Sequence, residues 1–370
     1  MNIIESPFPY AHVENPMIVK LSKTTADPVV FSIVILSKTI YYTSYPKYDE
    51  ANEYYVVEFD LAKVFAPYFD DKNLMFIGYD FTLNAENSLV GYSVRGGISK
   101  RQFMQLKAID SEIFSYRFLS AQRQFLLTTR TQDDIINIRR GELRYVYFFR
   151  DPNNDITFSA PGLTPQVFTA DSFNLECFDV VQWMGATTVN QITITKNTHT
   201  TTINIIDSQV DNKILLMFRN SLGVFEHIEL TGKGITYPNV QTEEFEQYNE
   251  DYGDFSQLNR RGISKEFIEA ESGYKNSDEL HFIKDLLMSD EIYLITGNEE
   301  LPCRVSASSF KIPLVINTPQ SVSLRISMSN QERNYTDITP VQLGPVPPII
   351  GDGDILLSPS GSAIFAYITV

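Results

Sequence analysis

Short runs of β-branched and aromatic residues, separated by turn residues, recur along most of this chain. One run spans residues 29–36 and follows the turn signal Asp27-Pro28. Two alternating runs, 191–195 and 201–205, are joined by a polar linker of hairpin length. Many short strands at this spacing are typical of sandwiches and barrels rather than of alternating α/β units. The pattern therefore predicts a mainly β fold.

The chain has 370 residues, which is more than a single hydrophobic core usually serves. We therefore expect two or three β-sandwich-like domains. The turn-rich segments place a first β-sandwich at residues 1–111, a second at 112–235 and a third, β-rich domain at 236–338. A proline-rich, extended C-terminal arm is expected over 339–370.

One clear helical pattern lies in the C-terminal third. Asn276 and Glu279 have the spacing of a capping box, which predicts a short helix over 277–288. The apolar face of this helix is formed by Leu280, Ile283 and Leu287. A second segment, after Asp60, has the composition of a single helical turn that Pro67 is expected to end.

The charge of the chain excludes some partners. Thirty Lys and Arg against 46 Asp and Glu give a formal net charge of −16, so the chain has no overall field for nucleic acid or for an anionic membrane. The pair Arg139-Arg140 is expected at a solvated strand end. The longest apolar run, near 29–36, is too short for a membrane helix of roughly 20 residues. The N-terminus has no secretory-signal pattern.

No catalytic or metal-binding motif is present in the sequence. The chain has no P-loop, G-x-G-x-x-G, G-x-S-x-G or H-E-x-x-H pattern. None of the histidines has metal-ligand spacing from another, and His227 and His281 fall in predicted regular elements, which indicates structural roles. Cys177 and Cys303 have apolar neighbours and are expected to be buried free thiols. The chain is therefore predicted not to be an enzyme and to bind no cofactor or metal.

Two features leave a binding role open. The segment 243–254 mixes acidic and aromatic residues and is interpreted as a solvated loop, with binding of cations or a basic partner as the alternative. The single Trp183 is interpreted as a core residue, with sugar stacking as the alternative.

Three segments, taken in order, resemble a known group of proteins. They are 118–143, which contains FLLTTR and RRGEL, 215–226 (LLMFRNSLGVFE), and 271–294, in which ESGYK precedes the predicted helix. This order resembles structural tail or baseplate proteins of tailed bacteriophages and prophages of Bacteroidetes-like bacteria. The resemblance implies a virion protein that is made in the cytoplasm of a bacterial host. It implies no catalytic residues.

The predicted C-terminal arm is the candidate contact segment. Its prolines lack the amide donor that a central strand needs, so we expect it to leave the third domain in an extended form. Residues 364–370 then alternate like a strand. Either this strand folds back onto its own sheet, or it adds to the sheet of a neighbouring subunit. In the second case the contact residues would be Phe365, Tyr367, Ile368 and Val370.

Together these features predict a structural assembly protein of a phage virion, in the tail, baseplate or neck. Its partners would be copies of itself and other virion proteins. The alternative is a carbohydrate-binding or adhesion module that recognises a bacterial surface glycan. A glycan-cleaving enzyme is disfavoured because no pair of catalytic acids can be named among 46 acidic residues.

Overall fold

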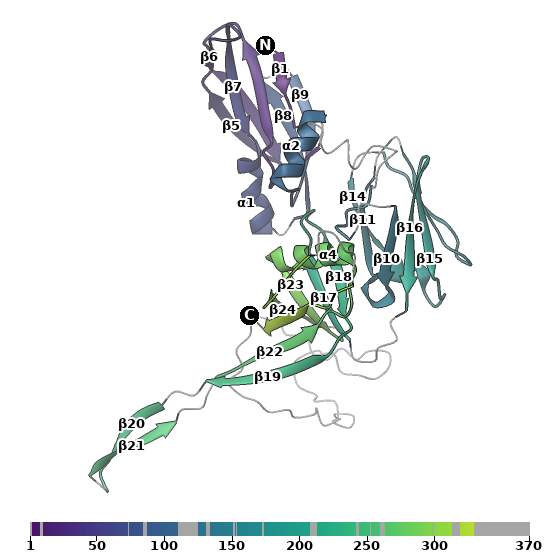
Figure 1. Ribbon diagram of the computed structural model, residues 1–370. Coiled ribbons are helices and arrows are strands. Elements are labelled where there is room, and N and C mark those ends of the chain that lie inside the picture. The colour runs from purple at the N-terminus through teal and green to yellow at the C-terminus, as the bar shows by residue number, and fades with distance from the viewer. Residues whose placement is uncertain are drawn as a thin grey trace, which may run out of the picture. The chain divides into compact units, whose positions relative to one another are not determined.

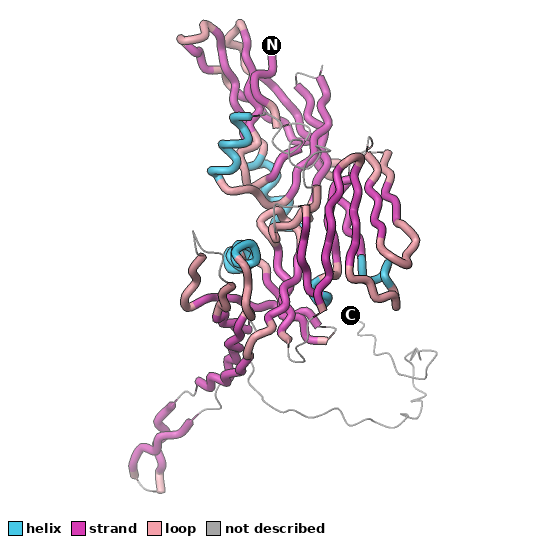
Figure 2. Tube along the Cα trace, turned by 45° about the vertical axis from the view of Figure 1, so that its right-hand side comes forward, coloured by secondary structure: helices cyan, strands magenta, loops and turns pink. Residues whose placement is uncertain are grey.

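The computed structural model confirms the mainly β fold (Figure 1), and Figure 2 shows strands as the prevailing element. It describes residues 2–328 except 8–9, 73, 84–86, 110–124, 131–133, 151, 153, 172–173, 208–212, 242–243, 252, 260–262, 298 and 313–318. One unit comprises residues 1–239 and 265–330, and a second has its described residues between 240 and 264. The predicted arm over 339–370 lies outside the described residues, and the division into domains stays a prediction.

Two sheets pack face to face in the N-terminal part. The first has the order β1 (Asn2–Glu5), β3 (Ile18–Lys23), β7 (Tyr54–Asp60) and β6 (Lys47–Asp49). The second has the order β2 (Tyr10–His12), β9 (Asn87–Val94), β8 (Phe76–Leu83), β4 (Val29–Ile35) and β5 (Lys38–Ser44). Leu21 and Val57 of the first sheet share one buried core with Phe31 and Phe81 of the second. Alternate residues of the central strands β3, β4 and β8 therefore form the core of a sandwich.

Helix α1 (Ala62–Lys72) is longer than the single turn predicted, and Pro67 lies inside it. The expectation that Pro67 ends the helix is wrong. An internal proline costs about 3 kcal/mol. However, Leu61, Phe65 and Phe69 follow one another at four-residue spacing and are all buried in the sandwich core. Burial of each such side chain contributes about 1.5–3 kcal/mol, so together they outweigh the proline.

The middle of the chain forms a five-stranded sheet and a two-stranded sheet. The first has the order β10 (Ile135–Arg139), β16 (His199–Ile206), β15 (Gln191–Lys196), β12 (Ile156–Ser159) and β13 (Gln166–Phe168). The second pairs β11 (Tyr145–Arg150) with β14 (Asn174–Asp179). The predicted hairpin is confirmed as β15–β16, and Asn197 takes the left-handed conformation (φ 52°) that its turn needs. Trp183, interpreted as a core residue, is half-buried and packs on Phe178 beside the core cluster.

Two helices, one before the middle part of the chain and one within it, were not predicted. They are α2 (Lys100–Ile109) and α3 (Val180–Met184). Asp179 caps α3 by accepting a hydrogen bond from Gln182 N at 2.9 Å.

The C-terminal part is a seven-stranded sheet covered by one helix. Its order is β18 (Phe225–Leu230), β17 (Ile214–Arg219), β23 (Ile292–Thr296), β24 (Glu299–Ala307), β25 (Ser323–Met328), β22 (Ile263–Glu271) and β19 (Gly234–Gln241). The predicted helix is confirmed as α4 (Ser277–Met288), with the capping box formed by Asn276 and Glu279. Leu280 and Ile283 are buried in the core of this sheet. Because β17 and β18 belong here, the predicted boundary at 235 falls within the sheet.

Candidate functional site

A buried ionic network, centred on Arg130, joins segments that are far apart in the sequence. Arg130 Nη1 donates to Glu142 Oε2 at 2.9 Å, and Arg130 Nε lies 3.7 Å from Glu226 Oε1. Arg130 Nη2 donates to the carbonyl oxygen of His227, and its guanidinium carbon lies 4.2 Å from the centroid of the Phe282 ring. The side chains of Arg130, Glu142 and Glu226 are 8, 2 and 10% exposed. Arg130 therefore links the 3₁₀ turn η2 (Arg140–Glu142), β18 and α4.

Both oxygens of the Glu142 carboxylate accept hydrogen bonds from the backbone. Its Oε1 accepts from Glu229 N at 2.8 Å, and its Oε2 accepts from Arg139 N at 3.2 Å. Burial by itself would raise the pKa of this carboxyl. The charges of Arg130 and Lys275, with the two backbone donors, outweigh burial and hold the pKa below its ordinary value. Glu142 is therefore charged in the folded protein and compensates the buried arginine.

At Glu226 burial has a larger effect on the pKa than the neighbouring charge and hydrogen bonds. It accepts from Thr128 Oγ1 and from Asn220 Nδ2, both at 2.6 Å. Its pKa is nevertheless raised, because burial outweighs the charge of Arg130 and these hydrogen bonds. The two carboxyls on Arg130 thus differ in acidity. Both are held by hydrogen bonds and by the charge of Arg130.

His227 is also buried in this network. It is 3% exposed, and its Nε2 has no hydrogen-bond partner among the described residues. Burial, followed by the charges of Arg144 and Arg130, lowers the pKa of the imidazole to about 4. The ring is therefore neutral near pH 7 and far from the pKa that suits a general base there. This environment supports the structural interpretation of His227.

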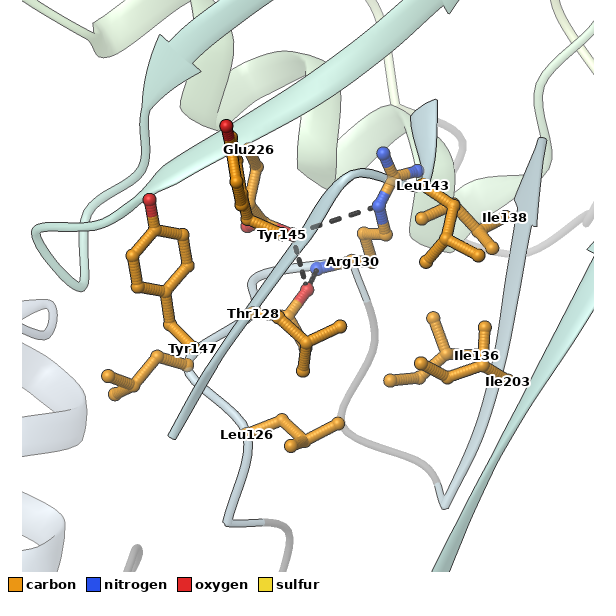
Figure 3. Close-up of a pocket in the computed structure, with 12 residues that line it drawn as sticks. Leu126, Thr128, Arg130, Ile136, Ile138, Leu143, Tyr145, Tyr147, Ile203 and Glu226 are labelled. Atoms are coloured by element: carbon orange, nitrogen blue, oxygen red, sulfur yellow. Dashed lines mark hydrogen bonds and ion pairs between the residues drawn. The ribbon is translucent and has the colours of Figure 1, made fainter. Parts of the chain in front are cut away.

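Figure 3 shows the cavity beside the network. Thr128, Arg130 and Glu226 are its polar lining, and the apolar lining includes Leu126 and Ile136. Its volume is about 40 Å³. A ligand pocket has a volume of about 300–1,000 Å³, whereas a cavity of roughly 10–15 Å³ is enough for one water molecule. The cavity can hold water but not a substrate or cofactor.

Neither cysteine has the lowered pKa that is typical of a reactive thiol. Cys303 is buried, as predicted, and burial raises the pKa of its thiol to about 11. The prediction is wrong for Cys177, which is exposed on β14. No group of three His, Cys, Asp or Glu side chains among the described residues is placed to hold a metal ion.

The turn between β17 and β18 contacts the segment that follows β9 of the N-terminal sandwich. Gly97 N donates to Ser221 O at 2.6 Å. Gly223 has a φ of +87°, and a Cβ at this position would lie 1.9 Å from Arg95 O. Only glycine allows this approach of the two backbones. A small apolar cluster, which includes Val94 and Leu222, packs around the contact.

The second unit contains a hairpin, and the interpretation of 243–254 as a loop is wrong. Strands β20 (Glu244–Asn249) and β21 (Asp254–Asn259) pair in antiparallel register, as Figure 1 shows. Tyr248 faces Phe255 with ring centroids 5.3 Å apart, and these side chains are 53 and 62% exposed. Neither strand pairs with a third among the described strands. We call residues 244–259 the aromatic hairpin.

A concave surface also lies on the first sheet of the N-terminal sandwich. We define this polar groove by residues from β3, β6, β7 and the adjoining turns, and its volume is about 840 Å³. Tyr45 and Tyr48 in its lining are 75 and 55% exposed. Lys20, Lys47 and Glu58 bring charges of both signs to the same surface. The groove is large enough for a small ligand and combines aromatic with charged side chains.

The predicted contact residues Phe365, Tyr367, Ile368 and Val370 lie outside the described residues. No protein-family model matches the chain, and no curated protein matches it either. Across the described residues, every helix is too short or too polar to cross a membrane. Function is therefore inferred from the chemistry of the described side chains.

Proposed function

We propose that this chain is a structural assembly protein of a phage virion, in the tail, baseplate or neck, and that it acts through protein–protein contacts. The observation that carries this proposal is the aromatic hairpin. A two-stranded hairpin is marginally stable by itself in water. Tyrosine and phenylalanine side chains are enriched where proteins bind one another. An exposed hairpin with an aromatic pair is therefore suited to be ordered against a partner.

The rest of the described chain supports this proposal. The buried ionic network and the glycine contact at Gly223 hold distant segments together, which gives a scaffold with defined surfaces. The net charge of −16 disfavours association until a complementary partner is met.

The test replaces the aromatic pair in the producing phage with Tyr248→Ser and Phe255→Ser. We expect particles that lack this protein or stop at an incomplete stage, as judged by electron microscopy and immunoblotting of purified particles. Tyr41→Ser is the matched control, because Tyr41 is 73% exposed but lies on β5 of the sandwich. Complete, infectious particles from the double variant would contradict the proposal.

A second candidate is adhesion to a bacterial surface glycan, favoured by the polar groove. Exposed Tyr45 and Tyr48 can stack on a sugar ring, and the neighbouring charged groups can bond its hydroxyls. If this is the function, the purified protein binds host cells, and Tyr45→Ala with Lys47→Ala reduces the bound amount at least about tenfold, or 1.4 kcal/mol. Equal binding by variant and wild type would exclude the groove as the site.

A further inference from the structure

We infer that the outer face of the seven-stranded sheet binds an extended, acidic segment of a partner protein. The inference rests on the proposed function, because it names the chemistry of one protein–protein contact. Leu324 and Ile326 of β25 are buried in the core that α4 covers. Arg325 lies between them in the sequence and is exposed, so it lies on the opposite face of the sheet. Arg304 of β24 is also exposed and follows the buried Cys303.

The strand register places two arginines and two serines side by side on this outer face. Arg304 lies opposite Ser327, and Arg325 lies opposite Ser306. Residues that lie directly opposite one another share a face of the sheet, so the four side chains form one block. The two arginines are diagonal neighbours in this block, and such neighbours are about 7–8 Å apart.

Two aromatic rings extend the block onto the next strands. The guanidinium carbon of Arg325 lies 3.7 Å from the centroid of the Phe267 ring of β22. The Phe267 ring stacks on Tyr237 of β19, with centroids 5.1 Å apart and planes inclined by 16°. A cation that is already held over a ring loses less conformational freedom when it binds a partner. We call the block and these two rings the arginine face.

The two arginines have no carboxylate partner in the described part of the chain. Neither Arg304 nor Arg325 forms an ion pair with a described residue. Glu269 lies opposite Arg325 in the register of β22 and β25, but the guanidinium lies over Phe267 instead. Other described arginines do pair with Asp or Glu, namely Arg95, Arg130, Arg139, Arg140, Arg150 and Arg219. The arginine face can therefore bind acids from outside the chain.

Acidic side chains two residues apart match the spacing of the two arginines. On an extended segment such side chains lie on one side and about 7 Å apart. Each carboxylate can then form two parallel hydrogen bonds to one guanidinium. The hydroxyls of Ser306 and Ser327 can donate to the carboxylate oxygens that remain. A segment in which Asp or Glu occupies every second position is therefore the partner chemistry that fits.

A protein fits the arginine face better than a nucleic acid or a glycan does. Arginine, tyrosine and phenylalanine are enriched where proteins bind one another. Bases and sugar rings need an open aromatic surface for stacking, whereas the Phe267 ring already contacts Arg325 and Tyr237. The net charge of −16 also opposes the approach of a long polyanion.

A second copy of this chain is the disfavoured partner. A two-fold symmetric contact would bring the arginine face against itself, with like charges opposed. Any other contact between copies brings together two chains that each carry a net charge of −16. The acidic segment is therefore expected on a different protein.

The experiment measures binding of two fluorescein-labelled octapeptides to the full chain by fluorescence anisotropy at about 0.15 M salt. In one peptide glutamate and serine alternate, and in the other the same glutamates form one block. We expect tighter binding of the alternating peptide. Arg304→Gln with Arg325→Gln should weaken its binding about tenfold, because two charge-assisted contacts are lost. Arg304→Lys with Arg325→Lys keeps the charge and should weaken binding several-fold, because the planar fork is lost.

A matched control separates the arginine face from the general charge of the chain. Lys63→Gln with Arg101→Gln removes two exposed cations from α1 and α2. We expect this control to bind the alternating peptide within about twofold of the wild type. Circular dichroism spectra that match the wild type show that each variant is folded.

Three results would overturn the inference. The first is equal binding of the two octapeptides, or an equal loss in the arginine-face and control variants. The second is tighter, arginine-dependent binding of octathymidylate or of a heparin octasaccharide, which would assign the face to a nucleic acid or a glycan. The third is a wild-type dimer in sedimentation that the Arg304→Gln, Arg325→Gln variant loses, which would assign it to a second copy.

The outcome is distinguishable from failure of the proposed function. If the protein is a regular part of the particle and yet the arginine-face variants bind the alternating peptide like the control, only the choice of partner chemistry is wrong. If the protein is absent from the particle, the proposed function is wrong, whatever the peptide binding.

Discussion

The substitution Arg130→Met tests whether the buried ionic network holds the scaffold together. Methionine keeps much of the length of the side chain and its packing near Phe282 but removes the charge. It leaves Glu142, 2% exposed, and Glu226, 10% exposed, without their common cation. Loss of one partner of a buried ion pair costs about 3–5 kcal/mol, because the other charge stays buried without compensation. We expect a decrease of this size in the free energy of unfolding.

The assay is urea denaturation at pH 7, followed by far-ultraviolet circular dichroism and intrinsic fluorescence. A double-mutant cycle with Glu142→Gln isolates the pair. The cost of the double variant should be at least about 1 kcal/mol below the sum of the two single costs, because the residues are in direct contact. The control is Arg140→Met, which removes the exposed ion pair with Asp207 and should cost about 0–1 kcal/mol. A cost for Arg130→Met no larger than that of Arg140→Met would refute the reasoning.

Three further predictions concern pH and the backbone. Between pH 6.5 and 4 the unfolded chain binds a proton at His227 that the folded chain excludes. The contribution of His227 to the free energy of unfolding is therefore fully present above pH 6.5 and decreases by about 3 kcal/mol toward pH 4. The decrease in the free energy of unfolding between pH 7 and pH 4, measured by urea titration, should be about 3 kcal/mol smaller in His227→Gln than in the wild type. Gly223→Ala should lower the free energy of unfolding by about 2 kcal/mol or more. Gly185→Ala should lower it less, because a Cβ at Gly185 meets nothing within 4 Å. Thermal unfolding of the two variants compares these costs. Leu36→Asn with Ser37→Gly should raise the free energy of unfolding by about 1 kcal/mol, because both native residues have positive φ in the β4–β5 turn; an unchanged or lower thermal midpoint would contradict this.

The sequence predicts elements whose signal is local. The capping box of Asn276 and Glu279 and the apolar spacing that follows define α4 without tertiary information. The β15–β16 hairpin is similarly visible, because both of its strands alternate around a short polar turn. Helix α1 is the counterexample. Pro67 is a local stop signal, but burial of Phe65 and Phe69 in the sandwich core overrides it.

The ionic network and the aromatic hairpin depend on pairing that is not local. Arg130 and Glu226 are 96 positions apart, and by composition each is an ordinary surface residue. Only the assembled fold buries them together. In the hairpin the density of acids indicates a loop, whereas the Tyr248–Phe255 pair becomes visible only in the strand register. Cross-strand aromatic pairs of this kind stabilise hairpins.

The central claim is that the chain is a structural part of a phage particle. The most direct test is quantitative mass spectrometry of particles purified from the producing host, with isotope-labelled peptides of this chain as standards. The account predicts that the protein is present in every preparation at a fixed copy number relative to the major capsid subunit. Its absence from purified particles, or a copy number that varies with washing, would contradict the account.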